Sequence, residues 1–264
     1  MMGDRNQKRV VVFDMDETLG YFTDLGVLWD CLNITSSLDN DHFFEIVDLF
    51  SIYLRPQIMN ILKFIKKMKQ KNKCHKVMIY TNNQGPKSWT QLITGYFENK
   101  LDYNLFDQLI LSFKLDGKRV ELNRTSHNKS VKDFFKCTDL PTNVHICFLD
   151  DKYHPEMDDE QVYYVHMKPY HYSIEYRELA DSYYDKFHNQ FQLGEKSEFV
   201  DSLVNCMKQF GFNKHHTTKE ELAVDEVIGK QIMICIKDFF DEHGNTRRHR
   251  PKKDKSFKNK TRRR

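Results

Sequence analysis

Two aspartates that follow the first apolar run of the chain are the residues best suited to chemistry. The run covers Arg9 to Phe13, and Asp14-Met15-Asp16-Glu17-Thr18 comes directly after it. Alternate residues of an extended segment face the same side, so Asp14 and Asp16 can approach one ligand. Neighbouring carboxylates resist ionising together unless a cation compensates, and Mg²⁺ does so through oxygen ligands. One carboxylate could then act as a nucleophile and the other as a general acid and base. An acidic turn at a strand end would give the same D-x-D-x-T pattern.

Two more groups of polar residues follow apolar runs in the same way. Thr81-Asn82-Asn83 comes after the run 76–80, and Asp150-Asp151 comes after the run 144–149. The hydroxyl and amides of the first group could bind phosphate oxygens without adding charge, although Thr and Asn also favour ordinary turns. The second group could complete an oxygen site for Mg²⁺, or it could begin a helix.

A lysine upstream of the third run would supply the cation that this chemistry needs. Lys129 and Lys132 are the two candidates. A positive charge opposite the nucleophile would balance two carboxylates and a phosphate dianion. Either lysine could equally be a solvated surface residue. It is the joint arrangement that is specific, because the acidic pair, the hydroxyl, the lysine and the second acidic pair occur in this order along the chain.

The apolar runs predict the elements that position these residues. Unbroken runs at 9–13, 76–80 and 144–149 are typical of central strands of a parallel sheet, and helix-like stretches such as 57–69 lie between them. Further strands are expected at 106–113 and 161–167, and helices at 172–191, 197–210 and 219–242. We therefore expect an α/β fold, a doubly wound and mostly parallel sheet with helices on both faces. Ligands of such sheets bind at the carboxyl ends of the strands, where the polar groups lie.

In this order the residues resemble the four motifs of haloacid dehalogenase (HAD) phosphatases. VVFDMDETLG resembles motif one, MIYTNN motif two, the lysine motif three and CFLDD motif four. The chain looks most similar to the NLI-interacting-factor-like group, which includes the phosphatases of the RNA polymerase II C-terminal domain. The similarity rests on D-E-T-L at 16–19, R-P at 55–56 before a helix, and V-K-D at 131–133. The last of these favours Lys132 over Lys129 as the motif-three lysine.

The sequence departs from that group at two places. Thr81-Asn82-Asn83-Gln84-Gly85 stands where the group usually has T-A-S, and this wording is closer to nucleotidase-like and polynucleotide 3′-phosphatase members. Gly20 replaces the usual branched residue after D-E-T-L. Like the group, the chain has no room for a large cap between motifs one and two. We expect a loop with short strands or helical turns at 23–51.

The resemblance implies a Mg²⁺-dependent phosphomonoester hydrolase. In such an enzyme Asp14 attacks phosphorus and carries the phosphoryl group, while Asp16 protonates the leaving oxygen and then activates water. Mg²⁺ would be held by Asp14, by the backbone carbonyl of Asp16, and by Asp150 or Asp151. Lys132 is expected to act in catalysis by neutralising the phosphoryl oxygens. Thr81, Asn82 and Thr18 are expected to bind the substrate, and Thr18 also to hold the turn after the first strand.

The expected substrate is phosphoserine or phosphothreonine of a protein, because an uncapped site would suit a peptide. A phosphatase of nucleic-acid ends or nucleotides is the alternative, suggested by T-N-N-Q-G and by the basic C-terminal segment. An inactive HAD-like binding scaffold is a third alternative. The presence of Asp14, Asp16, Thr81, Lys132 and Asp150 together argues against it.

Charge and length divide the chain into three expected parts. We expect a HAD-like phosphatase core at 1–192, a C-terminal helical extension at 193–246 and a basic disordered tail at 247–264. The tail holds eleven Lys and Arg residues and a single acid, Asp254, while the whole chain carries only +3. Such a block repels itself and has little to bury. It predicts attraction to nucleic acid or a nuclear signal, although a merely solvated end would look the same.

The remaining composition predicts a soluble intracellular protein, cytoplasmic or nuclear. No apolar run approaches the length of a membrane span, and the polar start MMGDRNQKR does not resemble a signal peptide. None of the six cysteines forms a C-x-x-C pair, so we expect reduced buried thiols rather than a disulfide framework or a zinc site. They are Cys31, Cys74, Cys137, Cys147, Cys206 and Cys235.

Overall fold

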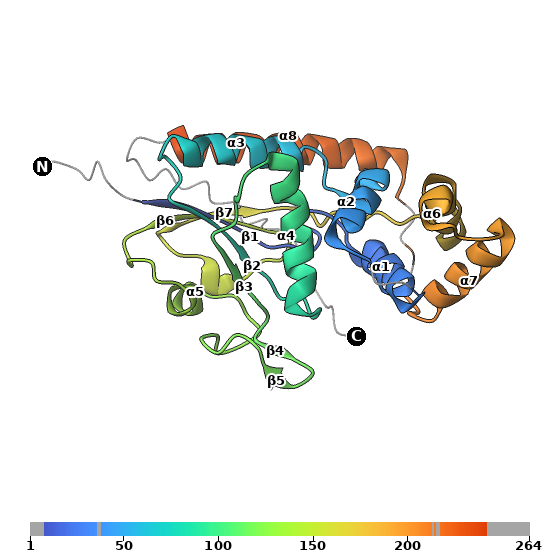
Figure 1. Cartoon of the computed structure of the whole chain (residues 1–264). Coiled ribbons are helices and arrows are strands. Elements are labelled where there is room, and N and C mark those ends of the chain that lie inside the picture. The colour runs from blue at the N-terminus through green and yellow to red at the C-terminus, as the bar shows by residue number, and fades with distance from the viewer. Residues whose placement is uncertain (1–7, 36–37, 213, 215–216, 242–264) are drawn as a thin grey trace, which may run out of the picture.

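The computed structural model describes residues 8–35, 38–212, 214 and 217–241. The predicted basic tail at 247–264 lies outside the described residues. The helices and strands form an α/β protein built around one parallel sheet (Figure 1). Among the described residues, no helix combines the length and the apolar character that crossing a membrane requires.

Five parallel strands form the sheet in the order β3-β2-β1-β6-β7. The strands are β1 (Arg9–Phe13), β2 (Lys76–Tyr80), β3 (Gln108–Ile110), β6 (His145–Asp150) and β7 (Val162–His166). In register, Phe13 of β1 lies opposite Ile79 of β2 and Leu149 of β6. The carboxyl ends of the three central strands therefore meet at one edge of the sheet. The predicted α/β class and its parallel sheet are confirmed.

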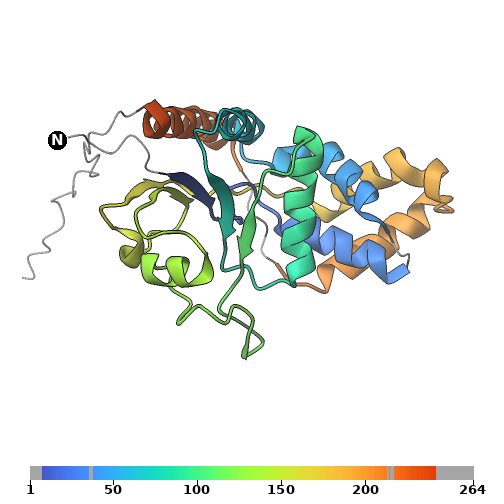
Figure 2. The ribbon, with the colours of Figure 1, turned by 60° about the vertical axis from the view of Figure 1, so that its left-hand side comes forward.

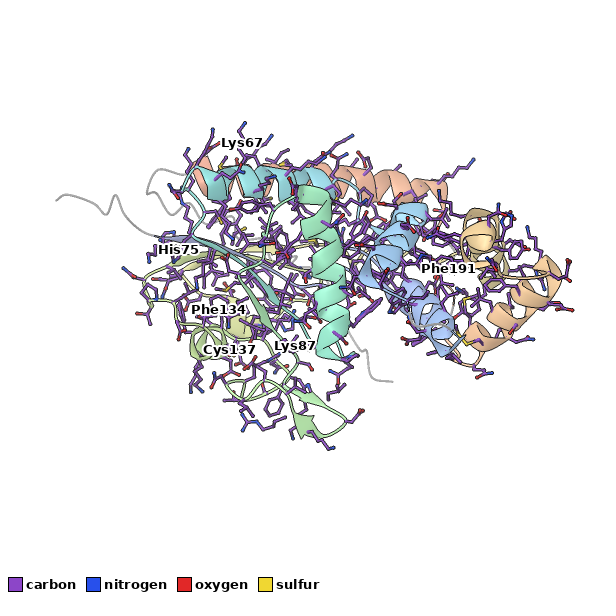
Figure 3. All side chains as sticks on the ribbon, in the orientation of Figure 1. Lys67, His75, Lys87, Phe134, Cys137 and Phe191 are labelled. Carbon is purple, nitrogen blue, oxygen red and sulfur yellow. A yellow bond between two sulfur atoms is a disulfide. The ribbon has the colours of Figure 1, made fainter. Side chains whose placement is uncertain are left out.

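Helices cover both faces of the sheet, which explains why the central strands are continuously apolar. Val11 and Phe13 pack into the larger core beneath α3 (Ile58–Gln70), α4 (Lys87–Leu101) and α8 (Lys219–Asp241). Val10 and Val12 pack into a second core on the opposite face. There α5 (Val131–Cys137) contributes Phe134, which Figure 3 labels.

The segment at 23–51 forms two full helices rather than the expected loop. They are α1 (Thr23–Thr35) and α2 (Asn40–Leu49), followed by a 3₁₀ turn at Ser51–Tyr53. With α6 (Tyr176–Phe191) and α7 (Lys196–Lys208) they form a helical lobe beside the sheet (Figures 1 and 2). His42 of α2 shows the contact across the lobe, since its Nε2 lies 2.8 Å from the Tyr183 hydroxyl of α6. The helices are stable because each buries its apolar side against partners distant in sequence.

A disulfide joins this lobe, so the prediction of reduced thiols was wrong for two of the six cysteines. Cys31 of α1 and Cys206 of α7 are bonded across 175 residues of chain. The other cysteines are free. Two thiols so far apart in sequence come together only through the packing of α7 on α1, and no local sequence pattern predicts this pairing. The cysteines therefore no longer support the predicted cytoplasmic or nuclear location.

The predicted boundary at residue 192 falls in the link between the C-terminal helices α6 and α7. Helices α6 and α7 pack on each other across that boundary. Helix α8 returns to the sheet and lies along α3 (Figure 2). The approach is close at Gly229, where an added Cβ would lie 2.3 Å from the backbone oxygen of Pro56. Helix α8 is therefore part of the helical layer of the core.

A short hairpin extends the chain between β3 and α5. The expected strand at 106–113 is limited to β3, and the hairpin follows as β4 (Lys114–Leu115) and β5 (Lys118–Arg119). A 3₁₀ turn at Pro155–Met157 lies between β6 and β7. The loop that returns from the hairpin to α5 carries residues of the site described next.

Candidate active site

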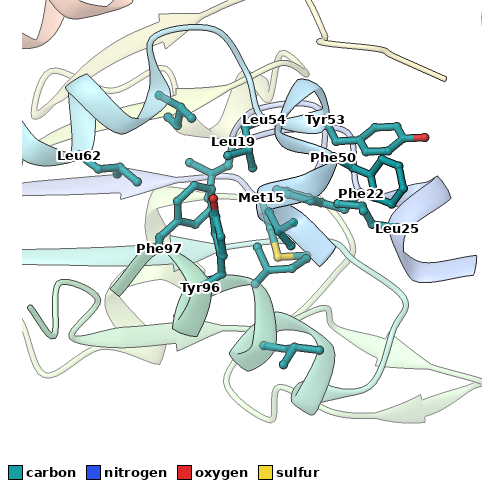
Figure 4. Close-up of a cluster of buried hydrophobic side chains, with 14 of the residues drawn as sticks. Met15, Leu19, Phe22, Leu25, Phe50, Tyr53, Leu54, Leu62, Tyr96 and Phe97 are labelled. Carbon is teal, nitrogen blue, oxygen red and sulfur yellow. The ribbon is translucent and has the colours of Figure 1, made fainter. Parts of the chain in front are cut away.

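The motif-one turn starts at the end of β1 and is anchored in the core. The Asp14 backbone N–H donates to the Leu149 carbonyl at 2.8 Å, which continues the sheet ladder by one residue. Met15 and Leu19 are fully buried in the apolar cluster shown in Figure 4. Because Met15 points into the core, Asp14 and Asp16 on either side of it face the carboxyl edge of the sheet.

Arg55 and Gly20 hold this turn closed. The buried guanidinium of Arg55 donates to the Thr18 carbonyl at 2.7 Å and also to the Glu17 carbonyl. An added Cβ at Gly20 would lie 2.6 Å from the Tyr53 backbone oxygen, so a branched residue does not fit there. The R-P pair and the unusual glycine are thus two parts of the same packing arrangement.

Lys129, not Lys132, is the lysine of the site. The Lys129 ammonium is buried, 2.5 Å from Asp14 Oδ1 and 2.7 Å from Asp150 Oδ2. Lys132 lies in the first turn of α5 and is exposed. The preference for Lys132 was therefore wrong. The physical reason is that Ser130 caps α5, which turns Lys132 outward and leaves Lys129 just before the helix, facing the sheet edge.

Three aspartates gather around this lysine. Asp14, Asp150 and Asp151 each offer an oxygen within 4.8 Å of the others. Burial raises the pKa of Asp14 to about 8, with the charges of Asp150 and Asp16 adding to the shift and Lys129 opposing it. Burial and the charge of Asp150 raise the pKa of Asp151 to about 6. A single ammonium does not offset three carboxylates. The oxygen ligands and the missing positive charge both fit a divalent cation such as Mg²⁺.

Thr18 contacts Asp151 and does not line the cleft. Its hydroxyl lies 3.2 Å from Asp151 Oδ1 and accepts the Asp151 backbone N–H at 3.1 Å. The threonine is buried. The expectation that Thr18 holds the turn fits these contacts, whereas the substrate-binding role given to it does not.

Asp16 lines the same cleft as the buried lysine and has a hydrogen-bond partner of its own, Asn83. Burial raises its pKa, and a hydrogen bond from Asn83 opposes the shift. The Asn83 Nδ2 donates to Asp16 Oδ2 at 2.8 Å. A carboxyl group that keeps its proton more readily than usual suits a general acid.

The motif-two segment is held by an arginine that the sequence analysis missed. Thr81 continues the ladder after β2, with its N–H donating to the Ile110 carbonyl at 3.0 Å. The fully buried Arg124 donates to the Thr81 carbonyl at 2.9 Å and to Asn82 Oδ1 at 2.7 Å. It also donates to the His127 carbonyl at 3.0 Å. Arg124 therefore ties motif two to the segment that leads into Lys129. One arginine in a polar loop gives no sequence signal for this role.

These side chains surround a small cleft of about 110 Å³. Predicted residues Asp14, Asp16, Thr81, Asn82 and Asp150 line it together with Lys129. Asn83, Lys152 and His154 line it as well and were not predicted as site residues. The His154 Nε2 lies 3.4 Å from Asp150 Oδ2. Only a group about the size of a phosphoryl would be enclosed, so the rest of any substrate would extend outside.

No protein-family model matches the chain, and comparisons with curated proteins and with solved structures gave no match. The fold and the site together define an α/β protein with a parallel sheet and a buried three-aspartate, one-lysine centre at its carboxyl edge.

Proposed function

We propose that this chain is a Mg²⁺-dependent phosphomonoester hydrolase of the HAD type, in which Asp14 forms an aspartyl-phosphate. One observation carries the proposal. The Lys129 ammonium lies buried between Asp14 and Asp150, at the ends of two neighbouring strands. A structural ion pair would need one carboxylate, whereas this lysine faces two, with a third nearby and an open cleft in front.

The geometry supports the following roles for the nucleophile and the groups around it. Asp14, Asp150 and Asp151 would hold Mg²⁺, which supplies positive charge to the phosphoryl oxygens when bound. Lys129 would offset part of the negative charge of Asp14 and Asp150 and add its positive charge to the cleft where the phosphoryl group is transferred. Thr81 and Asn82 offer a hydroxyl and an amide to the remaining oxygens.

Proton transfer is assigned to Asp16. In the first step the Asp14 oxygen bonds to phosphorus while the bond to the leaving oxygen breaks, and that oxygen takes the Asp16 proton. In the second step Asp16 accepts a proton from water as the water oxygen attacks phosphorus and releases Asp14. Burial raises the pKa of Asp16, which favours the protonated form needed at the start.

We propose phosphoserine or phosphothreonine of a protein as the substrate. The cleft of about 110 Å³ would enclose little more than a phosphoryl group, and an extended peptide would lie across its open mouth. The test is a side-by-side assay of a phosphopeptide, a 3′-phosphorylated DNA and a nucleotide, with Mg²⁺ or with excess chelator. Wild type should hydrolyse the phosphopeptide fastest, only with Mg²⁺. Asp14→Asn should lose about 10³-fold or more in rate while remaining folded. Full activity in chelator, or in Asp14→Asn, would contradict the proposal.

A further inference from the structure

The turn at 81–85 carries an asparagine whose side chain faces the proposed acid. Asn83 Nδ2 donates to Asp16 Oδ2 at 2.8 Å, and Asn83 lines the same cleft as Asp16. The two residues come from different strand ends, β2 and β1, which lie side by side in the sheet. The contact therefore joins motif two directly to the carboxyl group that has to move a proton.

The orientation of the Asn83 amide is determined by its other contact. Asn83 Oδ1 accepts the Gly85 backbone N–H at 2.7 Å. A backbone N–H is only a donor, so the end of the amide that faces Gly85 has to be the oxygen. The amide NH₂ therefore faces Asp16. The Asn83 backbone N–H donates to Thr81 Oγ1 at 2.9 Å, which holds the turn itself.

Gly85 makes this arrangement sterically possible. An added Cβ at position 85 would lie 2.8 Å from Asn83 Oδ1, closer than real Cβ contacts. A side chain at 85 would push the amide oxygen away and turn the NH₂ from Asp16. The unusual sequence T-N-N-Q-G thus has a physical explanation, because the orientation of the second asparagine depends on the glycine two residues later.

We propose that Asn83, oriented by Gly85, is a positioning residue that holds the Asp16 carboxyl group for proton transfer to the leaving oxygen. The proposal rests on the proposed phosphatase function. The Asn83 donor occupies Oδ2, so the proton that Asp16 transfers would be the one on Oδ1. As the Asp14–phosphorus bond forms, the bond from phosphorus to the leaving oxygen breaks. The leaving oxygen keeps the electron pair and receives the Oδ1 proton. Without Asn83 the carboxyl group would rotate freely and present its proton less often.

Dependence on the leaving group tests this role. The substrates are aryl phosphates from p-nitrophenyl to p-methoxyphenyl, together with benzyl phosphate. A p-nitrophenolate departs without a proton, whereas a benzyl alkoxide needs one. Asn83→Ala and Gly85→Ala should each lower kcat/KM for benzyl phosphate by about 10–100-fold, with kcat/KM for p-nitrophenyl phosphate changed by less than about threefold. The comparison uses kcat/KM because this ratio reports the first step alone and leaves out the water step, in which Asp16 acts as base for every substrate.

Two matched variants serve as controls. Gln84 lies in the same turn with an exposed side chain, and Gly95 lies in α4, where an added Cβ would meet only the Phe44 ring at 3.5 Å. Gln84→Ala and Gly95→Ala should leave the whole substrate series unchanged. Asn83→Ser provides a smaller change should Asn83→Ala fail to fold.

Equal losses across the series, or a raised KM with unchanged leaving-group dependence, would overturn the positioning role and assign Asn83 to substrate binding or to folding. A neutral Gly85→Ala would overturn the pairing with Gly85. If wild type hydrolyses none of the substrates, the proposed function fails and this proposal fails with it. If wild type is active but the variants lower the rate equally for all leaving groups, this proposal alone is overturned.

Discussion

Replacing Lys129 by Met, compared with replacing Lys132 by Met, separates the buried lysine from its near neighbour in sequence. Methionine keeps much of the length of the stem and removes the ammonium. At position 129 the loss leaves Asp14 and Asp150 facing each other without the charge that lies 2.5 and 2.7 Å away. At position 132 the side chain is exposed.

The size of each expected effect follows from how deeply the replaced lysine is buried. Breaking a buried ion pair costs about 3–5 kcal/mol in the free energy of unfolding, and protonation of Asp14 offsets part of that cost, because its pKa is already raised. Loss of one charged group from a closed site costs about 3–4 kcal/mol of transition-state stabilisation, or about 10²–10³-fold in kcat/KM. An exposed Lys132→Met should change stability by less than about 0.5 kcal/mol.

The assays are p-nitrophenyl phosphate hydrolysis and thermal unfolding, each with and without Mg²⁺. Lys129→Met should be nearly inactive and less stable. Added Mg²⁺ should raise its Tm at least as much as that of wild type, since the cation then has no competing ammonium. Loss of activity in Lys132→Met, together with normal activity in Lys129→Met, would refute the assignment.

Three further predictions concern the metal, the disulfide and the buried arginine. The pKa values of Asp14 and Asp151 are raised from 3.8 to about 8 and about 6, so the metal-free protein should lose stability as the pH rises from 4 to 8. Mg²⁺ should raise the Tm more at pH 8 than at pH 5, and a pH-independent effect would argue against these ligands. Cys31→Ser should lower the free energy of unfolding by about 2–5 kcal/mol in urea titrations. It should leave aryl-phosphate turnover at 20 °C unchanged, because neither bonded cysteine lines the cleft; reduced turnover would show that the lobe shapes the site. Arg124→Lys keeps the positive charge but loses the planar guanidinium that donates to several acceptors at once. It should lower the free energy of unfolding by about 2–4 kcal/mol and lower kcat/KM at least about tenfold. Unchanged kinetics would show that the motif-two segment does not need Arg124.

Local sequence patterns were sufficient to predict the central strands, which are buried on both faces of the sheet. The strands ending at Phe13 and Tyr80 have the predicted bounds, and β6 is shifted by a single residue. Short continuous apolar runs are typical of central parallel strands, and each of these runs is followed by polar residues at the same sheet edge. The positions of Asp14, Thr81 and Asp150 around one cleft were therefore predictable.

Long-range packing explains what the sequence did not reveal. Helices α1 and α2 depend on α6 and α7, which lie more than a hundred residues away, and the Cys31–Cys206 bond depends on the same packing. Lys129 comes just before the N-cap of α5, whereas Lys132 lies in the first turn of that helix. The V-K-D pattern marks that helix start, where Asp133 accepts the Thr125 N–H at 2.6 Å, rather than the buried lysine that lines the cleft.

A covalent phosphoryl group on Asp14 is the most direct test of the central claim. Asp16→Asn should accumulate it from p-nitrophenyl phosphate, because that leaving group departs without a proton while the water step still needs a base. The reaction is quenched in acid, the protein is digested, and the peptide containing Asp14 is examined by mass spectrometry. The account predicts one phosphoryl group on Asp14, present with Mg²⁺ and absent in an Asp14→Asn, Asp16→Asn double variant. Wild-type turnover with no phosphoryl group on Asp14 in Asp16→Asn, or a phosphoryl group on another residue, would contradict it.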